Sequence, residues 1–157
     1  MPPKLLFDIA GIDLKTVLFG PEEIRHYNPQ RGDMEQINGL VYIDTVAHRF
    51  IAFKDVRADE FWVPGHVPGR PLMPGVLMIE AAAQAASFYM RKYVGWDGFI
   101  GFNGVESCKF RQQVLPGCRL YILTEKAWDR HKRFCCNCQG IVDGNIAFET
   151  TIIGSQF

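Results

Sequence analysis

The chain has 157 residues, of which 48% are hydrophobic and 22% are charged, and this composition suits one soluble domain with a single core. Its 17 basic and 17 acidic residues balance, which argues against a dominant electrostatic attraction to nucleic acid or to anionic lipid. Apolar runs stay well below the roughly 20 residues that span a bilayer, so we expect no membrane span.

The first 25 residues are predicted to form an N-terminal extension, followed by a single domain over residues 26–157. Some helical character is expected over residues 8–18. A second helical segment is expected from Pro21, because a proline in the first turn is followed there by acidic residues. Asp8 interrupts the apolar run that a secretory signal peptide would need, so we predict no cleavable signal.

A hairpin and a long helix are predicted next. Residues 40–46 and 49–56 are rich in β-branched and aromatic side chains, which is typical of strands. Residues 74–93 are predicted to form a helix that ends at Gly95. Its middle is rich in alanine and apolar on nearly every side, which indicates a helix enclosed by other elements.

Strand patterns return after this helix. Four further strands are predicted over residues 99–110, 119–127, 133–142 and 146–153, with Asp143-Gly144 as a hairpin turn before the last. Two strands, one long helix and four strands indicate the α+β class. The simplest arrangement is an antiparallel sheet wrapped around one long central helix.

The chain has five cysteines, and three of them are crowded at Cys135, Cys136 and Cys138. An odd number favours free thiols and a reducing cytoplasm. The crowded group lacks the two-residue spacer of a zinc site, so we expect no metal and interpret these cysteines as small buried hydrophobes. On a strand, Cys136 and Cys138 would face one way and Cys135 the other.

The most informative feature is the pair formed by His66 and Glu80. His66 lies in a segment rich in proline and glycine, and Glu80 lies near the start of the predicted helix. Such loops hold a fixed shape, and a reactive group is often placed on a loop that a rigid scaffold supports. A base and an acid presented in this way suggest proton transfer on a bound substrate.

The residues around this pair form a spaced motif. It comprises Gly65-His66-Val67-Pro68-Gly69, Pro71, Met73-Pro74-Gly75-Val76-Leu77, Glu80-Ala81 and Ala83-Gln84, with later matches at Lys109-Phe110-Arg111, Val114, Pro116-Gly117 and Val142-Asp143-Gly144. This pattern resembles the β-hydroxyacyl-acyl carrier protein dehydratases of fatty acid synthesis, which have the hotdog fold. The resemblance covers residues 38–154, and it departs from the family at Val67 and Cys118.

The resemblance implies a chemistry for the pair. The substrate would be an R-configured β-hydroxyacyl thioester on acyl carrier protein, and the product a trans-2-enoyl thioester. His66 would remove the C2 proton and Glu80 would protonate the leaving hydroxyl, with no metal or organic cofactor. A glutamate at position 80, where relatives that also isomerise the double bond carry aspartate, implies a plain dehydratase.

Further residues are expected to support the site. The N–H of Gly75, at the helix start, is predicted to hold the thioester oxygen, with Val76 beside it in the substrate-binding position. Gln84 lies one turn beyond Glu80 and is predicted to orient its carboxyl. Carrier-protein contact or plain solvated surface is expected about equally for three basic residues: Arg70, Lys109 and Arg111.

The same resemblance implies an active site shared between two subunits, in a homodimer or a trimer of dimers. Met78, Phe88, Phe99 and Phe102 would line an acyl tunnel or form plain core, and the sequence does not choose between these. Two other functions stay open. One is a hotdog acyl thioesterase in which Glu80 activates water, and the other is a non-catalytic acyl-carrier binding subunit of a lipid or polyketide pathway.

Overall fold

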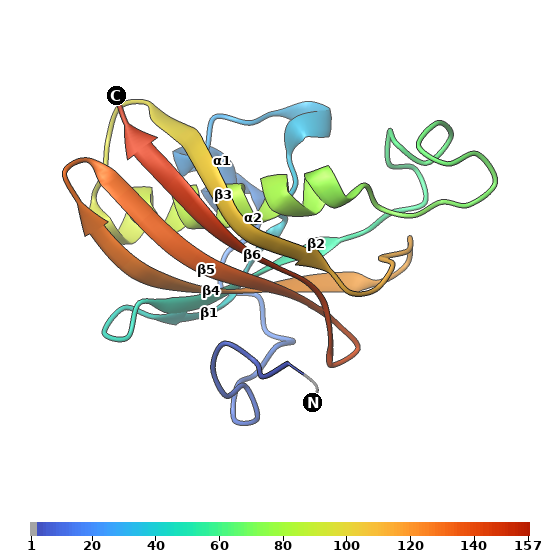
Figure 1. Cartoon of the computed structure of the whole chain (residues 1–157), viewed down its shortest axis with the longest axis horizontal. Coiled ribbons are helices and arrows are strands. Elements are labelled where there is room, and N and C mark those ends of the chain that lie inside the picture. The colour runs from blue at the N-terminus through green and yellow to red at the C-terminus, as the bar shows by residue number, and fades with distance from the viewer. Residues whose placement is uncertain (1–2) are drawn as a thin grey trace.

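A single antiparallel sheet curls around one long helix, α2, in a computed structural model that describes residues 3–157 (Figure 1). The strand order in the sheet is β1-β2-β4-β5-β6-β3. The strands are β1 (Gly39–Asp44), β2 (Arg49–Asp55), β3 (Ile100–Phe110), β4 (Arg119–Arg130), β5 (Arg133–Val142) and β6 (Asn145–Gln156). This arrangement confirms the predicted α+β class and the sheet wrapped around a central helix.

The central helix is built in two parts. The α-helix α2 (Gly75–Tyr89) is continued by one π-helical segment, η2 (Met90–Val94). The run ends at Gly95, whose φ of 86° lies in the left-handed region where glycine is favoured. The predicted helix over residues 74–93 and its stop at Gly95 are therefore confirmed.

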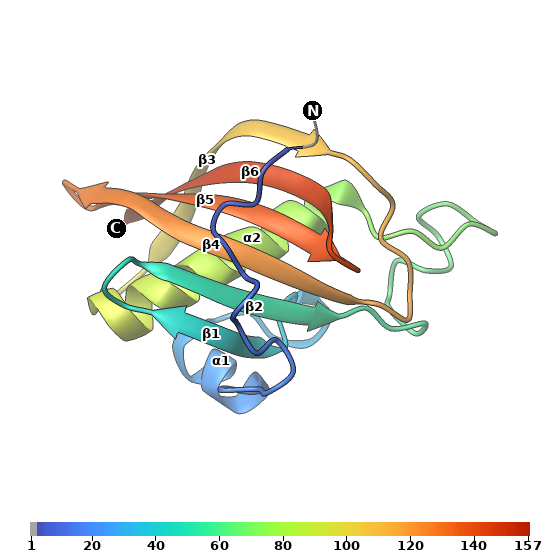
Figure 2. The ribbon, with the colours of Figure 1, turned by 90° about the horizontal axis from the view of Figure 1, so that it is seen from below.

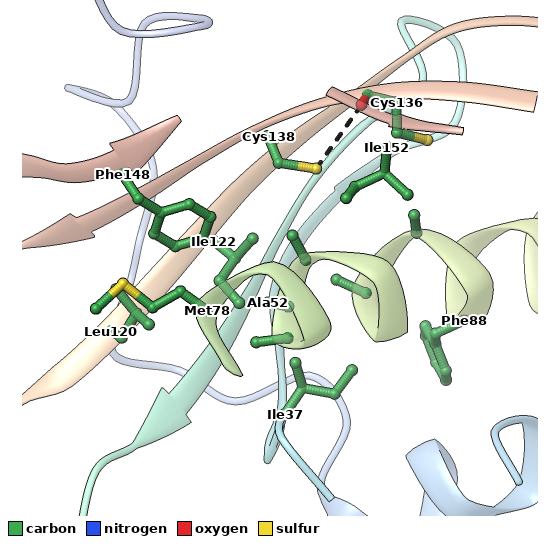
Figure 3. Packing of buried hydrophobic residues seen from close by; sticks show 14 of the residues in the cluster. Ile37, Ala52, Met78, Phe88, Leu120, Ile122, Cys136, Cys138, Phe148 and Ile152 are labelled. Atoms are coloured by element: carbon green, nitrogen blue, oxygen red, sulfur yellow. Dashed lines mark hydrogen bonds between the residues drawn. The ribbon is translucent and has the colours of Figure 1, made fainter. Parts of the chain in front are cut away.

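The main core lies between α2 and the concave face of the sheet (Figure 3). Met78 from α2 packs there with Leu120 and Phe148 from the sheet. Gly140 on β5 is required for this packing, because a Cβ at that position would lie 2.1 Å from Cε1 of Phe148. Cys136 and Cys138 belong to this core cluster and Cys135 does not, as the alternation along a strand predicts.

A polar segment covers the side of α2 that the sheet leaves free. It contains α1 (Pro21–Tyr27) and the short 3₁₀ helix η1 (Gly32–Met34). The ring of Tyr27 packs edge-on against Phe88 with 5.6 Å between centroids, and Nδ2 of Asn28 donates to the backbone oxygen of Gln84 at 3.0 Å. The helix predicted from Pro21 is present.

The segment before α1 crosses the convex face of the sheet, and we call residues 3–19 the N-terminal strap (Figure 2). The helical character expected over residues 8–18 is wrong, because this stretch consists of turns and extended chain. Asp13 accepts hydrogen bonds from the backbone N–H groups of Lys15 and Thr16, at 2.9 and 3.3 Å, and this turn competes with helix. The apolar side chains, among them Phe7, pack on the sheet instead.

Strand β3 forms one edge of the sheet and is exposed along most of its length. Large apolar side chains lie open on or beside it: Phe99, Phe102, Val105 and Phe110.

Within residues 3–157, no helix is long and apolar enough to cross a membrane. Strand ends differ from the sequence prediction by up to three residues: β6 runs to Gln156, and β4 runs to Arg130, so that the turn after β4 falls at His131 and Lys132, which both have positive φ.

Candidate active site

His66 lies on an exposed loop, residues 57–74, that extends beyond the N-terminal end of α2 (Figure 1). Its Nδ1 lies 3.0 Å from the backbone oxygen of Leu72. A carbonyl oxygen only accepts, so this contact assigns the proton of the neutral imidazole to Nδ1. The other nitrogen, Nε2, then carries a free lone pair, which is the form a general base requires.

Glu80 lies in the second turn of α2, and its carboxyl is held by Gln84. Nε2 of Gln84 donates to Oε1 of Glu80 at 2.9 Å and to the backbone oxygen of Met34 at 2.7 Å. The side-chain oxygen of Gln84 accepts the N–H of Gln36 at 2.9 Å. Gln84 is 2% exposed, so this network fixes the direction of the Glu80 carboxyl from within the protein.

A pocket of about 90 Å³ opens beside Glu80, between α2 and strands β3 and β6. Its walls include Ser87 and Phe102, and also Pro29 and Gln30 from the segment that covers α2. The sequence interpretation gave no role to Pro29 and Gln30. Local signals there indicate only turns, and their place beside Glu80 comes from tertiary packing that no local pattern reports.

The start of α2 forms one wall of a second, larger groove of about 550 Å³. Gly75 and Val76 line it together with Phe110 and Arg111. A Cβ at Gly75 would lie 2.7 Å from Cζ of Phe110, so only glycine fits against this ring without a shift. The first N–H groups of a helix lack intrahelical acceptors, and at this position they border the groove.

Within one chain, the two predicted reactive groups do not share a pocket. Among residues 3–157, the lining of the Glu80 pocket includes no residue of the loop 57–74. His66 is exposed, and its loop leads away from the helix rather than back along it (Figure 1). One chain therefore presents an imidazole at one place and a carboxyl at another.

The other predicted residues divide between surface and core. Arg70 and Lys109 are exposed, and Arg111 donates from Nε to Oε2 of Glu149 at 2.7 Å. The four apolar residues left open between tunnel and core also divide: Met78 and Phe88 are buried in the core, whereas Phe99 and Phe102 are exposed at the β3 edge. Phe102 alone among these four lines the Glu80 pocket within the described chain.

Comparison with known proteins identifies the family. The sequence profile of the FabA-like domain matches residues 28–151, which include both the His66 loop and α2. The chain belongs to the FabA-like domain family. The FabA-like match leaves the N-terminal strap outside it.

Solved structures share the hotdog fold with this FabA-like chain. The dehydratase heterocomplex ApeI:P of Xenorhabdus doucetiae aligns with a TM-score of 0.71 and 16% identity, over 85% of this chain and 90% of that one. The virulence protein Cj0977 of Campylobacter jejuni aligns with a TM-score of 0.63 and 16% identity, over 89% and 94%. A hypothetical thioesterase with coenzyme A from Streptococcus pneumoniae TIGR4 aligns with a TM-score of 0.57 and 8% identity, over 74% and 82%. At these identities the likeness supports the fold alone.

Proposed function

We propose that this FabA-like chain is a dehydratase that removes water from R-configured β-hydroxyacyl thioesters carried on acyl carrier protein, giving trans-2-enoyl thioesters. The observation that carries the proposal is that both reactive side chains are oriented by hydrogen bonds. Nδ1 of His66 is engaged by the oxygen of Leu72, and the Glu80 carboxyl is engaged by Gln84. An imidazole and a carboxyl set in this way suit one proton removal and one proton delivery.

In the proposed reaction, Nε2 of His66 takes the proton from C2 of the substrate. The electron pair of that C–H bond forms the C2–C3 double bond, the C3–O bond breaks, and Glu80 protonates the leaving hydroxyl to give water. Negative charge develops on the thioester oxygen, and the N–H groups of Gly75 and Val76 at the helix start are the proposed donors to it. Each positioned proton transfer contributes about 10²–10⁴-fold to the rate.

The proposed site is completed by a second copy of the chain, with His66 from one subunit and Glu80 from its partner. Two features support this assembly. The His66 loop extends away from its own helix, and β3 offers an unpaired edge that carries exposed apolar side chains (Figure 1). An open apolar sheet edge is a surface that proteins normally cover, and pairing with another strand covers it.

Turnover of a short β-hydroxyacyl thioester, followed by absorbance of the conjugated enoyl product, tests the proposed function. His66→Ala and Glu80→Gln are each expected to slow turnover by about 10²-fold or more. Release of free thiol without enoyl product would instead indicate a thioesterase. Carrier binding without turnover would indicate a non-catalytic subunit.

Mixing the two inactive variants tests the shared site. Random exchange makes about half of the dimers mixed, and each mixed dimer holds one intact site of two, so about a quarter of wild-type activity should return. Mixtures that stay inactive after subunit exchange has been verified would contradict a shared site.

The proposed compartment is the cytoplasm, which suits the five free cysteines.

A further inference from the structure

An ion pair is buried beneath the base of the His66 loop. Lys54 is 1% exposed and Glu60 is 5% exposed. Nζ of Lys54 lies 3.2 Å from Oε2 of Glu60 and 3.5 Å from Oε1. Lys54 is on β2, in register with Leu120 of the central strand β4, so the ammonium is carried by the rigid part of the sheet.

A pair of this kind is a poor device for stability alone. Removing two charges from water is costly, and replacing a buried pair with well-packed apolar side chains is often neutral or stabilising. A buried pair does fix the relative position of its two side chains, because each charge needs the other as its partner. Lys54 therefore helps to fix the position of Glu60, together with Arg57, whose Nη2 lies 3.9 Å from Oε1 of Glu60.

Glu60 passes this fixed position on to His66. Oε2 of Glu60 accepts the backbone N–H of Arg57 at 3.1 Å. The backbone oxygen of Glu60 accepts the N–H of Val63 at 3.1 Å. The oxygen of Trp62, within that turn, accepts the N–H of His66 at 2.9 Å. A series of contacts thus runs from the sheet, through the turn over residues 60–63, to the backbone of His66.

The other anchor of the loop is at its far end, where Met73 and Pro74 are buried and the N–H of Met73 donates to the backbone oxygen of Val114 at 2.8 Å. Between residues 57 and 72, all of which the structure describes, only Glu60 and Trp62 are buried. From residue 64 to residue 71 every side chain is exposed. Glu60 and Trp62 are therefore the last fixed points before His66 along the chain.

We propose that Lys54 and Glu60 are positioning residues, whose buried pair sets where the His66 loop leaves the sheet and so places the imidazole. The proposal rests on the proposed dehydratase function for its effect on rate. Neither Lys54 nor Glu60 is proposed to touch the substrate. A displacement of about 1 Å at a reacting group costs about 10²-fold in rate, so loss of the pair is expected to lower kcat by about 10–10²-fold with a much smaller change in KM.

The test compares three variants of the full-length protein. Lys54→Met with Glu60→Leu removes both charges together, which avoids leaving one buried charge unpaired. Lys54→Arg keeps the pair and is the conservative rescue. Arg49→Met with Glu125→Leu is the matched control, because it removes a half-buried ion pair between β2 and β4 at the end of β2 opposite to Lys54.

Three measurements are made on each variant: the unfolding midpoint, kcat and KM with a short β-hydroxyacyl thioester, and amide hydrogen exchange. The apolar double variant is expected to stay folded, to lose kcat, and to exchange faster at the N–H groups of Val63 and His66 than wild type. Lys54→Arg and the Arg49/Glu125 control are expected to behave as wild type in kcat and exchange.

Hydrogen exchange separates this proposal from the proposed function. Unchanged exchange at Val63 and His66 in the folded double variant overturns the positioning proposal, whether or not the wild-type protein turns over substrate. Faster exchange with unchanged kcat also overturns it. If wild type shows no dehydration while exchange at these two amides still accelerates, the proposed function fails and the pair is supported as the anchor of the loop.

Discussion

Gln84 joins Glu80 to Met34 through the two N–H bonds of a single side-chain nitrogen, at 2.9 and 2.7 Å. The direction of the Glu80 carboxyl is therefore coupled to the segment that covers the free side of α2. Since Gln36 donates to the oxygen of the same amide, one buried side chain connects the helix to that segment at two points. A change in the segment would move the carboxyl without touching the helix.

Replacing Gln84 with leucine should reduce both activity and stability. The variant leaves the buried N–H of Gln36 without its acceptor, which costs about 1–3 kcal/mol, and it removes the donor to the part-buried oxygen of Met34. The loss of the bond to Glu80 is expected to lower kcat by about 10–10²-fold, because a misdirected acid delivers its proton poorly. Enoyl formation and urea unfolding measure the two effects.

Ser87→Ala is the matched control for Gln84→Leu, since Ser87 lies on the same helix and in the wall of the same pocket. It should change kcat less than about threefold and stability by about 0.5 kcal/mol or less. A Gln84→Leu variant with wild-type kcat would show that Glu80 needs no orienting partner.

Lysine in place of Val105 should weaken self-association. Val105 is 40% exposed on the edge strand β3, and a charge there would have to be buried when another copy pairs with this edge. On dilution, we expect the dimer of this variant to dissociate at a higher protein concentration than the wild-type dimer does. Activity should fall as the dimer dissociates, because the proposed site needs two subunits. Sedimentation velocity across a dilution series measures the shift.

Val46→Lys provides the control, since Val46 is 92% exposed in the turn between β1 and β2, at the far side of the sheet from β3. Its association and activity should match wild type. An unchanged sedimentation profile for Val105→Lys would exclude β3 as the contact edge.

The N-terminal strap is expected to contribute stability rather than catalysis. Phe7 is 7% exposed and packs in the outer cluster with Ile51 and Leu123, and Gln139 binds the strap by accepting the N–H of Leu6 at 2.7 Å and donating to the oxygen of Lys4 at 2.9 Å. Phe7→Ala should lower the free energy of unfolding by about 3 kcal/mol, with kcat unchanged. Denaturant unfolding and enoyl formation measure the two quantities.

Leu18→Ala, at a side chain that is 50% exposed, should cost no more than about 0.5 kcal/mol and calibrates that measurement. Equal stability losses in the two variants would mean that the strap rests on the sheet without supporting it. A fall in kcat for Phe7→Ala, in protein that is still folded at the assay temperature, would assign the strap a part in catalysis.

Local composition predicted the sheet and the helix. The strands follow from runs of β-branched and aromatic residues, and the helix over residues 74–93 with its stop at Gly95 follows from an alanine-rich apolar run and from the turn that glycine permits. The helical character expected over residues 8–18 is wrong because the apolar side chains of the strap pack on the convex face of a sheet distant in sequence. Asp13 also turns the chain locally.

The site could be predicted only where its contacts are local. The bond from Gln84 to Glu80 spans one helical turn, and spacing alone indicates it. The bond from Gln84 to Met34 spans 50 residues, and the place of Gln30 beside Glu80 depends on the same packing, so no local signal reports either. The pair of Lys54 and Glu60 is close in sequence, but its importance lies in burial, which residue identity does not reveal.

Stability should decline at alkaline pH because of the buried thiols on β5. Burial raises the pKa of Cys138 from 9.0 to about 12, and burial also raises the pKa of Cys136. A thiol whose pKa is higher in the folded state stabilises the fold fully below pH 9, and this contribution is lost as the pH rises toward 12, since the unfolded chain ionises first. Each such thiol should cost about 1.4 kcal/mol of folding stability per pH unit in that window.

Urea unfolding at pH 8 and at pH 10.5 measures the decline. Cys138→Ala should remove one thiol's share of the decline. Identical declines in wild type and Cys138→Ala would show that the Cys138 thiol does not control alkaline unfolding.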